Sequence, residues 1–152
     1  MTLNAFIELC ASISTAAGIE IPDVAQDEEG LASITIEKDG VSVAVAHRSD
    51  LPGRVIVALG LGAVAEEDDY KACRILMESN FLMMGERATP CIGRNPSTRE
   101  FVLHYTHQLE GTRGVEIYGS ALAMIEVAKD WQRQLSGSAQ APSFGAMMLD
   151  RA

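Results

Sequence analysis

The first 37 residues contain no lysine or arginine. They hold seven acidic residues: Glu8, Glu20, Asp23, Asp27, Glu28, Glu29 and Glu37. With a formal net charge of -9 over 152 residues, the chain should repel nucleic acid and anionic membranes. The acidic start favours a partner that carries positive charge. Because this start also lacks the basic region of a secretory signal or transit peptide, we expect a cytoplasmic protein.

The chain also lacks long apolar segments and paired cysteines. Its longest apolar run, Val55 to Ala65, has eleven residues with two glycines among them, whereas a membrane span needs about 20. The cysteines Cys10, Cys73 and Cys91 form no CxxC pair and lie in apolar contexts. This pattern is typical of buried thiols in a reducing compartment and requires no disulfide.

Catalytic motifs are missing as well. There is no GxSxG elbow, no HExxH pair and no P-loop in the sequence. His104 and His107 lie three residues apart on an expected strand, so they should project to opposite faces and cannot chelate one ion together. Paired carboxylates occur only at turns and at one helix start, where solvation explains them. We therefore expect a binding protein, not an enzyme, with no metal and no cofactor.

One segment has the spacing of a dinucleotide-binding fingerprint. Gly60 to Ala65 reads GLGAVA and follows an apolar strand, which matches the GxGxxA form. Four carboxylates follow at residues 66–69, and they would repel a pyrophosphate at the start of the next helix. Hairpin turns precede the segment in place of a βαβ unit. A small nucleotide-using enzyme is therefore the weakest of the hypotheses that we carry forward.

Hydrophobic periodicity predicts an α+β fold in one domain over residues 1–135, followed by a flexible tail at 136–152. The expected fold has three helices and a twisted antiparallel sheet of about five strands, in the order α-β-β-β-α-β-β-α. The expected elements are a helix at 2–17, strands at 33–37, 41–45 and 54–59, a helix from 69 to about 79, strands at 89–92 and 100–107, and a helix at 114–135.

Two of the helices are apolar enough to raise the question of what covers them. In the first, Leu3, Phe6, Ile7 and Cys10 form a broad stripe that covers a sheet or serves in part as a docking surface. In the second, apolar residues occupy more than half of the circumference. Either one large core or a second copy of the chain must bury this second helix, since a two-fold dimer presents one patch to itself.

Two stretches carry a family resemblance. Residues 74–82, RILMESNFL, are similar to an "LLxANF" helix end, and residues 94–102, RNPSTREFV, are similar to a "DPxTGxV" turn. Together with the order and spacing of elements from Leu3 to Leu135, they resemble the Tir chaperone (CesT) family, the class I chaperones of bacterial type III secretion. Asn95, Arg99 and Ser79 depart from the family pattern, which has Asp, Gly and Ala there.

The resemblance implies a cytosolic homodimer that binds the unfolded N-terminal segment of a secreted effector, keeps it secretion-competent and delivers it, with the secretion ATPase as a further candidate partner. The predicted dimer residues are Tyr70, Cys73, Leu76, Met77 and Phe81. The predicted effector-binding residues are Leu3, Phe6, Ile7, Cys10, Ile34, Ile36, Val43 and Val45, although a closed core would use the same side chains. A regulatory module that sequesters a secretion-system regulator would have the same sequence features.

Overall fold

The computed structural model describes residues 2–20, 23–82 and 90–135. The described elements are α1 (Thr2–Ala17), β1 (Leu31–Lys38), β2 (Val41–Arg48), β3 (Arg54–Gly62), the 3₁₀ helix η1 (Glu66–Asp68), α2 (Asp69–Leu82), β4 (Cys91–Arg94), β5 (Phe101–Gln108) and α3 (Gly114–Leu135). The predicted α+β class and the predicted order of helices and strands are confirmed. The predicted tail at 136–152 lies outside the described residues.

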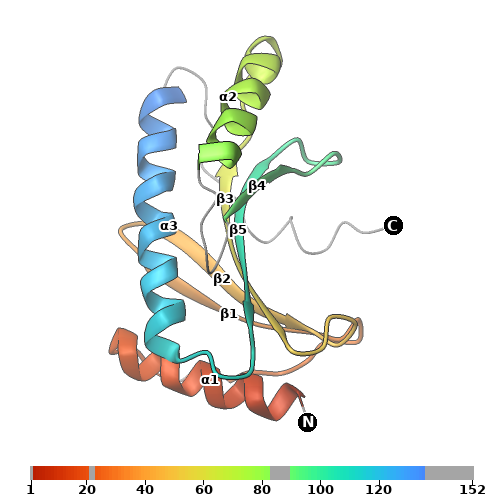
Figure 1. The fold of residues 1–152 in the computed structure, drawn as a ribbon, viewed down its shortest axis with the longest axis vertical. Helices are drawn as coiled ribbons and strands as arrows, with labels where there is room; N and C mark the ends of the chain where they lie inside the picture. Colours follow the sequence, from red (N-terminus) through yellow and green to blue (C-terminus); the bar gives the residue numbers. More distant parts are fainter. Residues whose placement is uncertain (1, 21–22, 83–89, 136–152) are drawn as a thin grey trace.

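The strands form one antiparallel sheet in the order β1-β2-β3-β5-β4 (Figure 1). Asp39 and Gly40 join β1 to β2, and both have positive φ, 53° and 75°. These angles fit the two-residue type I′ turn that Asp-Gly predicts between alternating strands. β3 lies between β2 and β5 and is buried along most of its length, as its apolar sequence on both faces predicts.

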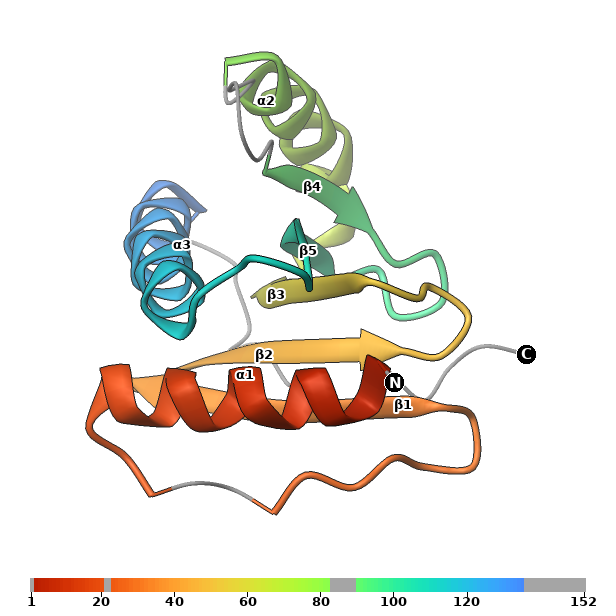
Figure 2. The same ribbon diagram turned by 60° about the horizontal axis from the view of Figure 1, so that its bottom comes forward.

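Helices α1 and α3 form a layer on one face of the sheet, whereas α2 lies apart from them at the β4 end. α1 lies in front of β1 and β2, α3 packs against β3 and β2, and α2 lies beside β4 (Figures 1 and 2). Along β1, Ala32, Ile34 and Ile36 are buried beneath this layer, whereas the alternate residues 33, 35 and 37 are exposed. The period-two pattern of the sequence therefore corresponds to a covered face and an open face.

α3 begins directly on the backbone of α1. A Cβ added to Gly114 would lie 2.3 Å from the carbonyl carbon of Ser12 and 2.4 Å from the backbone nitrogen of Ile13. The backbone N–H of Gly114 donates to the Ser12 Oγ at 3.2 Å, which satisfies one of the free donors at the start of α3. Glycine is therefore required at this crossing because of close approach.

The structure corrects several predicted boundaries, among them the end of α2 and the start of β4. α2 continues to Leu82, past the exit predicted at Ser79. The Ser79 hydroxyl donates to the backbone carbonyl of Ile75 at 2.9 Å, so this polar side chain is accommodated within the helix. The strand predicted at 89–92 is observed at Cys91–Arg94, where Cys91 pairs with His104 and Arg94 pairs with Phe101.

The dinucleotide-like segment is part of the sheet. β3 runs through Gly62, and Gly60 and Gly62 pair with Val102 and Phe101 on β5 across a register shift. The first half of GLGAVA is therefore an extended, paired strand with an irregularity, not a loop that presents its N–H groups to a phosphate. The strand prediction, which ended at Leu59, was too short because glycines are usually read as loop residues.

Candidate protein-binding surfaces

α2 has an apolar face that no other described residue covers. Tyr70, Met77 and Phe81 are 82%, 73% and 71% exposed. Their spacing of seven and four residues places all three on one side of the helix. Large exposed side chains gathered in one patch are typical of a protein–protein contact, because a monomer rarely leaves such a surface in water.

The opposite side of α2 belongs to the core of the chain. Ala72 is fully buried and Leu76 is 3% exposed, and both are part of the main hydrophobic cluster. Of the predicted dimer residues, Tyr70, Met77 and Phe81 lie together on the exposed face, and Cys73 is partly buried. The structure does not bring Leu76 to this face, so Leu76 offers almost no surface to a second molecule.

Two opposite charges accompany the exposed apolar face. Arg74 and Glu78 are exposed and lie four residues apart, on the same side of α2 as Met77. No hydrogen bond or ion pair joins either side chain to another of the described residues. The patch therefore combines apolar side chains with one cation and one anion that are free to meet complementary charges.

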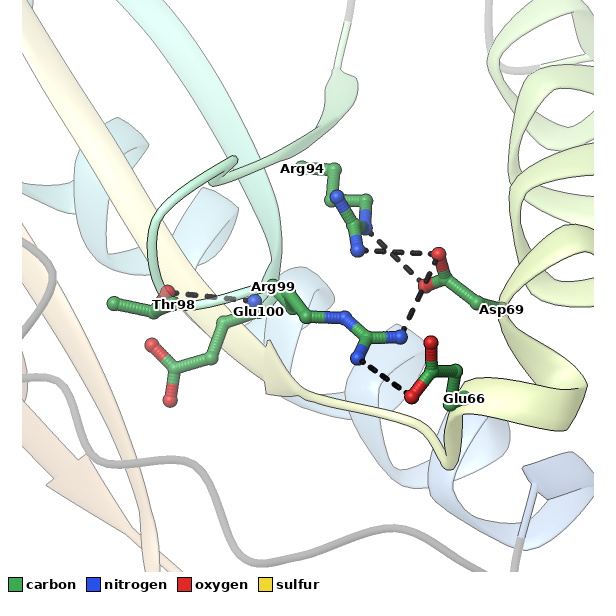
Figure 3. A network of polar contacts seen from close by, with 6 residues as sticks. All are labelled: Glu66, Asp69, Arg94, Thr98, Arg99 and Glu100. Atoms are coloured by element: carbon green, nitrogen blue, oxygen red, sulfur yellow. Dashed lines mark hydrogen bonds and ion pairs between the residues drawn. The ribbon is translucent and has the colours of Figure 1, made fainter.

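An ion-pair network fixes the start of α2 to the turn between β4 and β5 (Figure 3). The Arg94 guanidinium donates from Nε and Nη2 to the two carboxylate oxygens of Asp69, at 3.2 and 3.1 Å. Arg99 lies 3.9 Å from the same carboxylate and 3.7 Å from Glu66. The bidentate geometry orients α2, and with it the exposed face, relative to the sheet.

The two departures from the family turn pattern lie in this turn. Arg99 has a φ of 62°, a left-handed conformation that favours glycine. Its ion pairs to Glu66 and Asp69 offset part of that strain. The Asn95 Oδ1 accepts from the backbone N–H groups of Ser97 and Thr98 at 2.9 and 3.3 Å, as an aspartate would. Asn95 can therefore make the turn contacts of an aspartate, whereas Arg99 occupies a position that suits glycine better.

The outer edge of β4 is closed by a side chain of α2. The Asn80 Nδ2 donates to the Ile92 carbonyl at 3.0 Å, and the Ile92 N–H donates to the Asn80 Oδ1 at 2.7 Å. The amide thus makes the two hydrogen bonds that a neighbouring strand would make at this position. A further strand cannot add to β4 at Ile92 without displacing Asn80.

The outer edge of β1 is open from Thr35 onward. The two-residue turn makes Lys38 and Val41 a hydrogen-bonded pair, and hydrogen bonding alternates along an antiparallel ladder. The N–H and C=O groups of Thr35 and Glu37 therefore point away from β2, and no described strand lies on that side. Nearer its start, β1 is occupied by its own chain, because Gln26 bridges to Ala32 and the Asp27 N–H donates to the Leu31 carbonyl at 2.9 Å.

A partly exposed flank of α1 lies above this open edge. Leu3 is partly buried and Ile7 is 38% exposed. Helical spacing places both on the opposite side of α1 from Ser12, the residue that contacts α3. Because α3 lies toward β3 and β1 lies on the other side of α1 (Figure 2), this flank is the one nearer to β1. The flank and the edge together form a surface on which an extended peptide can find backbone partners and apolar contacts.

Most of the predicted effector-binding residues are closed off in the core. Each of the six is between 0% and 4% exposed: Phe6, Cys10, Ile34, Ile36, Val43 and Val45. The structure places them together between α1 and the sheet, but only Leu3 and Ile7 reach the surface. Sequence periodicity identified the contact between helix and sheet correctly and could not tell whether it was open to a client.

The titratable side chains among residues 2–20, 23–82 and 90–135 form no recognisable catalytic arrangement. Burial raises the pKa of the Cys10 thiol to about 12, which keeps it protonated and unreactive. Burial lowers the pKa of His104 and His107, which project to opposite faces of β5. Among the described residues, no three histidine, cysteine, aspartate or glutamate side chains gather as metal ligands would. No described helix has the length and apolar character to cross a membrane.

An open sheet edge and an unburied helix face are features typical of a protein that binds other proteins. The sequence profile of the Tir chaperone protein (CesT) family matches residues 9–132, and the chain belongs to this family. No curated protein sequence matches the chain.

The fold is also found in chains of solved protein complexes. A chain of the HopA1–SchA chaperone–effector complex is 12% identical, with a TM-score of 0.62, and the match covers 88% of this chain and 98% of that one. For the ExoU–SpcU complex of the Pseudomonas aeruginosa type III secretion system, identity is 14%, the TM-score 0.61 and coverage 86% and 99%. For the ExoT–SpcS complex of P. aeruginosa, identity is 12%, the TM-score 0.58 and coverage 83% and 96%.

Sequence reasoning missed Asn80 and the Arg94–Asp69 ion pair. Asn80 matches the asparagine of the "LLxANF" helix end, which singled the residue out but did not reveal its contact with Ile92. Arg94 and Asp69 are 25 residues apart, and pairing them requires knowledge that α2 lies beside β4. Neither contact could be inferred from local spacing.

Proposed function

We propose that the protein is a cytoplasmic chaperone of a type III secretion system. It binds the unfolded N-terminal segment of an effector, keeps the effector soluble and secretion-competent, and delivers it to the secretion apparatus, where the secretion ATPase is a candidate partner. The work is done by binding, without catalysis or a cofactor. Membership of the CesT family supports this function, and the fold shared with chaperone–effector complexes is consistent with it.

The proposed binding mode is based on one observation, the difference between the two edges of the sheet. Asn80 occupies the backbone groups of Ile92 at the β4 edge, whereas Thr35 and Glu37 leave theirs free at the β1 edge. An extended effector segment gains main-chain hydrogen bonds by adding to β1, independently of its own side chains. Its alternate apolar side chains then contact the flank formed by Leu3 and Ile7.

The active species in this proposal is a homodimer formed through α2. Tyr70, Met77 and Phe81 supply the apolar contact, and a two-fold axis would bring the same patch of a second copy against them. In an antiparallel pairing of the two helices, Arg74 of one copy lies near Glu78 of the other. The dimer would hold two β1 edges at a fixed separation, so one effector segment can contact both copies.

Residue-resolved amide exchange tests where the effector binds. The probes are the N-terminal segments of the secreted proteins encoded beside the gene, each produced together with the chaperone. Binding should slow exchange at the N–H groups of Thr35 and Glu37, which face outward. Ile34 and Ile36 should be slow in both states because their N–H groups already bond to β2.

A matched pair of variants makes the test specific. Thr35→Pro removes the outward N–H without removing a bond to β2, and Thr35→Val keeps the N–H while changing the side chain. The proline variant should lose effector binding while the valine variant keeps it, with circular dichroism showing that both are folded. Full binding by a folded Thr35→Pro variant would exclude strand addition at β1. Failure of every segment to bind the unaltered protein would instead exclude the chaperone function.

A further inference from the structure

We infer that the open edge of β1 selects client segments in which basic and apolar residues alternate. This inference rests on the proposed function, because it concerns the chemistry of the segment that adds to β1. It follows from the two faces of the sheet at that edge and from the distribution of charge around it.

The geometry of the edge imposes the alternation. Successive side chains of a strand point to opposite faces of its sheet, so every second residue of an added segment lies on the helix side. There it meets Leu3 and Ile7 on the flank of α1. The intervening residues lie on the open side, next to the exposed side chains of Thr35 and Glu37. Apolar residues suit the first set of positions and polar residues suit the second.

The charge around the edge determines which polar residues fit best. The chain before Arg48 carries eight carboxylates and a single cationic side chain, Lys38. Glu28 and Glu29 are exposed in the turn that precedes β1, and Glu37 is exposed near its end. A segment lying along the edge would therefore pass between carboxylates at both ends of the strand, which favours lysine or arginine on its open side.

The cations nearest the edge offset this field only in part. Lys38 is exposed at the end of β1, beside Glu37. Arg48 makes a bidentate contact to Asp50 at 2.8 and 2.6 Å. Lys129 of α3 donates to Asp39 at 2.8 Å and to Glu126 at 2.9 Å. Arg48 and Lys129 therefore each have a carboxylate partner within the chain, and the hydrogen bond with Asp50 and also the charge of Glu29 raise the pKa of Arg48. The three exposed carboxylates Glu28, Glu29 and Glu37 still outnumber Lys38 along the edge, so a net negative charge remains there.

The selection should be a moderate preference added to backbone pairing. Charges at this edge are exposed and screened by salt, so each ion pair should change the affinity by at most about fivefold. The preference should therefore weaken as the salt concentration rises, while the backbone contribution remains.

Two synthetic peptides of equal length test the inference, one alternating valine with lysine and the other valine with glutamate. Fluorescence anisotropy measures the affinity of each peptide. Slowed amide hydrogen exchange at the Thr35 N–H shows whether the peptide binds at the β1 edge. The lysine peptide should bind several-fold more tightly at low salt. Glu37→Lys should weaken its binding by about two- to fivefold and strengthen binding of the glutamate peptide. Glu67→Lys makes the same charge change in η1, away from β1, and should have little effect.

The possible results separate the inference from the proposed function. Equal affinity for both peptides with slowed exchange at Thr35 would overturn the charge preference and leave strand addition intact. Equal effects of Glu37→Lys and Glu67→Lys would also overturn it, because the net charge of the chain would then explain the result. If neither peptide slows exchange at Thr35, both the inference and strand addition at β1 are wrong.

Discussion

The side-chain amide of Asn80 makes two hydrogen bonds to the backbone of Ile92, one from Nδ2 to the carbonyl and one from the N–H to Oδ1. The contact joins α2 to the last strand of the sheet and occupies the edge groups that a further strand would use. In the described part of the chain, the sheet is therefore left with β1 as its open edge. Because α2 also carries the exposed apolar face, the same amide fixes the position of the proposed dimer contact.

Asn80→Ala should lower the free energy of unfolding by about 1–3 kcal/mol, since two partly buried backbone groups lose their partners. It should also promote aggregation, because the β4 edge becomes available for pairing. Urea unfolding and light scattering measure the two effects. Ser79→Ala is the control, since Ser79 bonds only to the carbonyl one turn earlier in the same helix. Equal stability of the two variants would show that the Asn80 contact contributes little.

Gly114→Ala should be strongly destabilising, whereas Gly119→Ala in the same helix should not. A Cβ at 114 would lie 2.3–2.6 Å from backbone atoms of Ser12 and Ile13, and relieving this overlap requires α1 and α3 to separate, at a cost of about 1–3 kcal/mol or more. Gly119 has no heavy atom within 4 Å of the added Cβ, so alanine should stabilise that helix by about 1 kcal/mol. Thermal unfolding of the two variants gives the comparison, and similar shifts in Tm would contradict close packing at Gly114.

The order of the elements could be predicted from the sequence because local signals mark them. Alternation along Ser33 to Glu37 and the Asp39-Gly40 turn determine the first hairpin, and both are observed. The last helix was predicted at its observed bounds, Gly114–Leu135. Such features depend on neighbours in the sequence, so periodicity and turn chemistry are sufficient to find them.

The surfaces could not be predicted to the same extent because they depend on contacts between distant segments. Periodicity showed that α2 is apolar on more than one side, but only the packing of β4 against it decides that Leu76 is inside and Met77 outside. For the same reason Phe6 and Val45 were candidates for an open groove, although α1 lies close enough to the sheet to bury both.

Met77→Asp should convert the proposed dimer to a folded monomer. Met77 is 73% exposed within one chain, so an aspartate there costs the fold little but would bury a charge in the dimer contact. Sedimentation velocity at micromolar concentration measures the association state. Val115→Asp is the control, because Val115 is 56% exposed on α3, outside the α2 patch. A monomeric unaltered protein would rule out the dimer, and dissociation by both variants would show that α2 is not the specific contact.

Charge reversal tests the antiparallel arrangement of α2. Arg74→Glu places like charges opposite Glu78 of the second copy and should weaken the dimer, as should Glu78→Arg. The double variant Arg74→Glu/Glu78→Arg restores opposite charges and should recover much of the association. If the two substitutions weaken the dimer additively in the double variant, these two residues are not in contact across the dimer. The apolar contact would still be tested separately by Met77→Asp.

Arg99→Ala should be less stable than Arg99→Gly. Both variants lose the ion pairs to Glu66 and Asp69, but alanine retains the strain of a φ near 62°, which glycine relieves at a gain of about 1 kcal/mol. Chemical unfolding in parallel gives the difference. High salt should lower the stability of the unaltered protein toward that of Arg99→Ala, because salt screens these partly exposed ion pairs and leaves the strain of the positive φ in place. If alanine equals glycine, the left-handed conformation at Arg99 is not strained in solution.

Stability should fall as the pH drops below about 6.5, the usual pKa of histidine in an unfolded chain. Burial lowers the pKa of His104 and His107 in the folded protein, so the unfolded chain binds more protons in this range and is favoured. Hydrogen bonds with Lys129 and Arg113 lower the pKa of Asp39 and of Glu116, respectively. The stabilisation that these two carboxylates contribute is therefore lost only below about pH 4. Urea unfolding between pH 7.5 and 5 should therefore show a decline that His104→Gln/His107→Gln flattens. An unchanged slope in that variant would assign the decline to other groups.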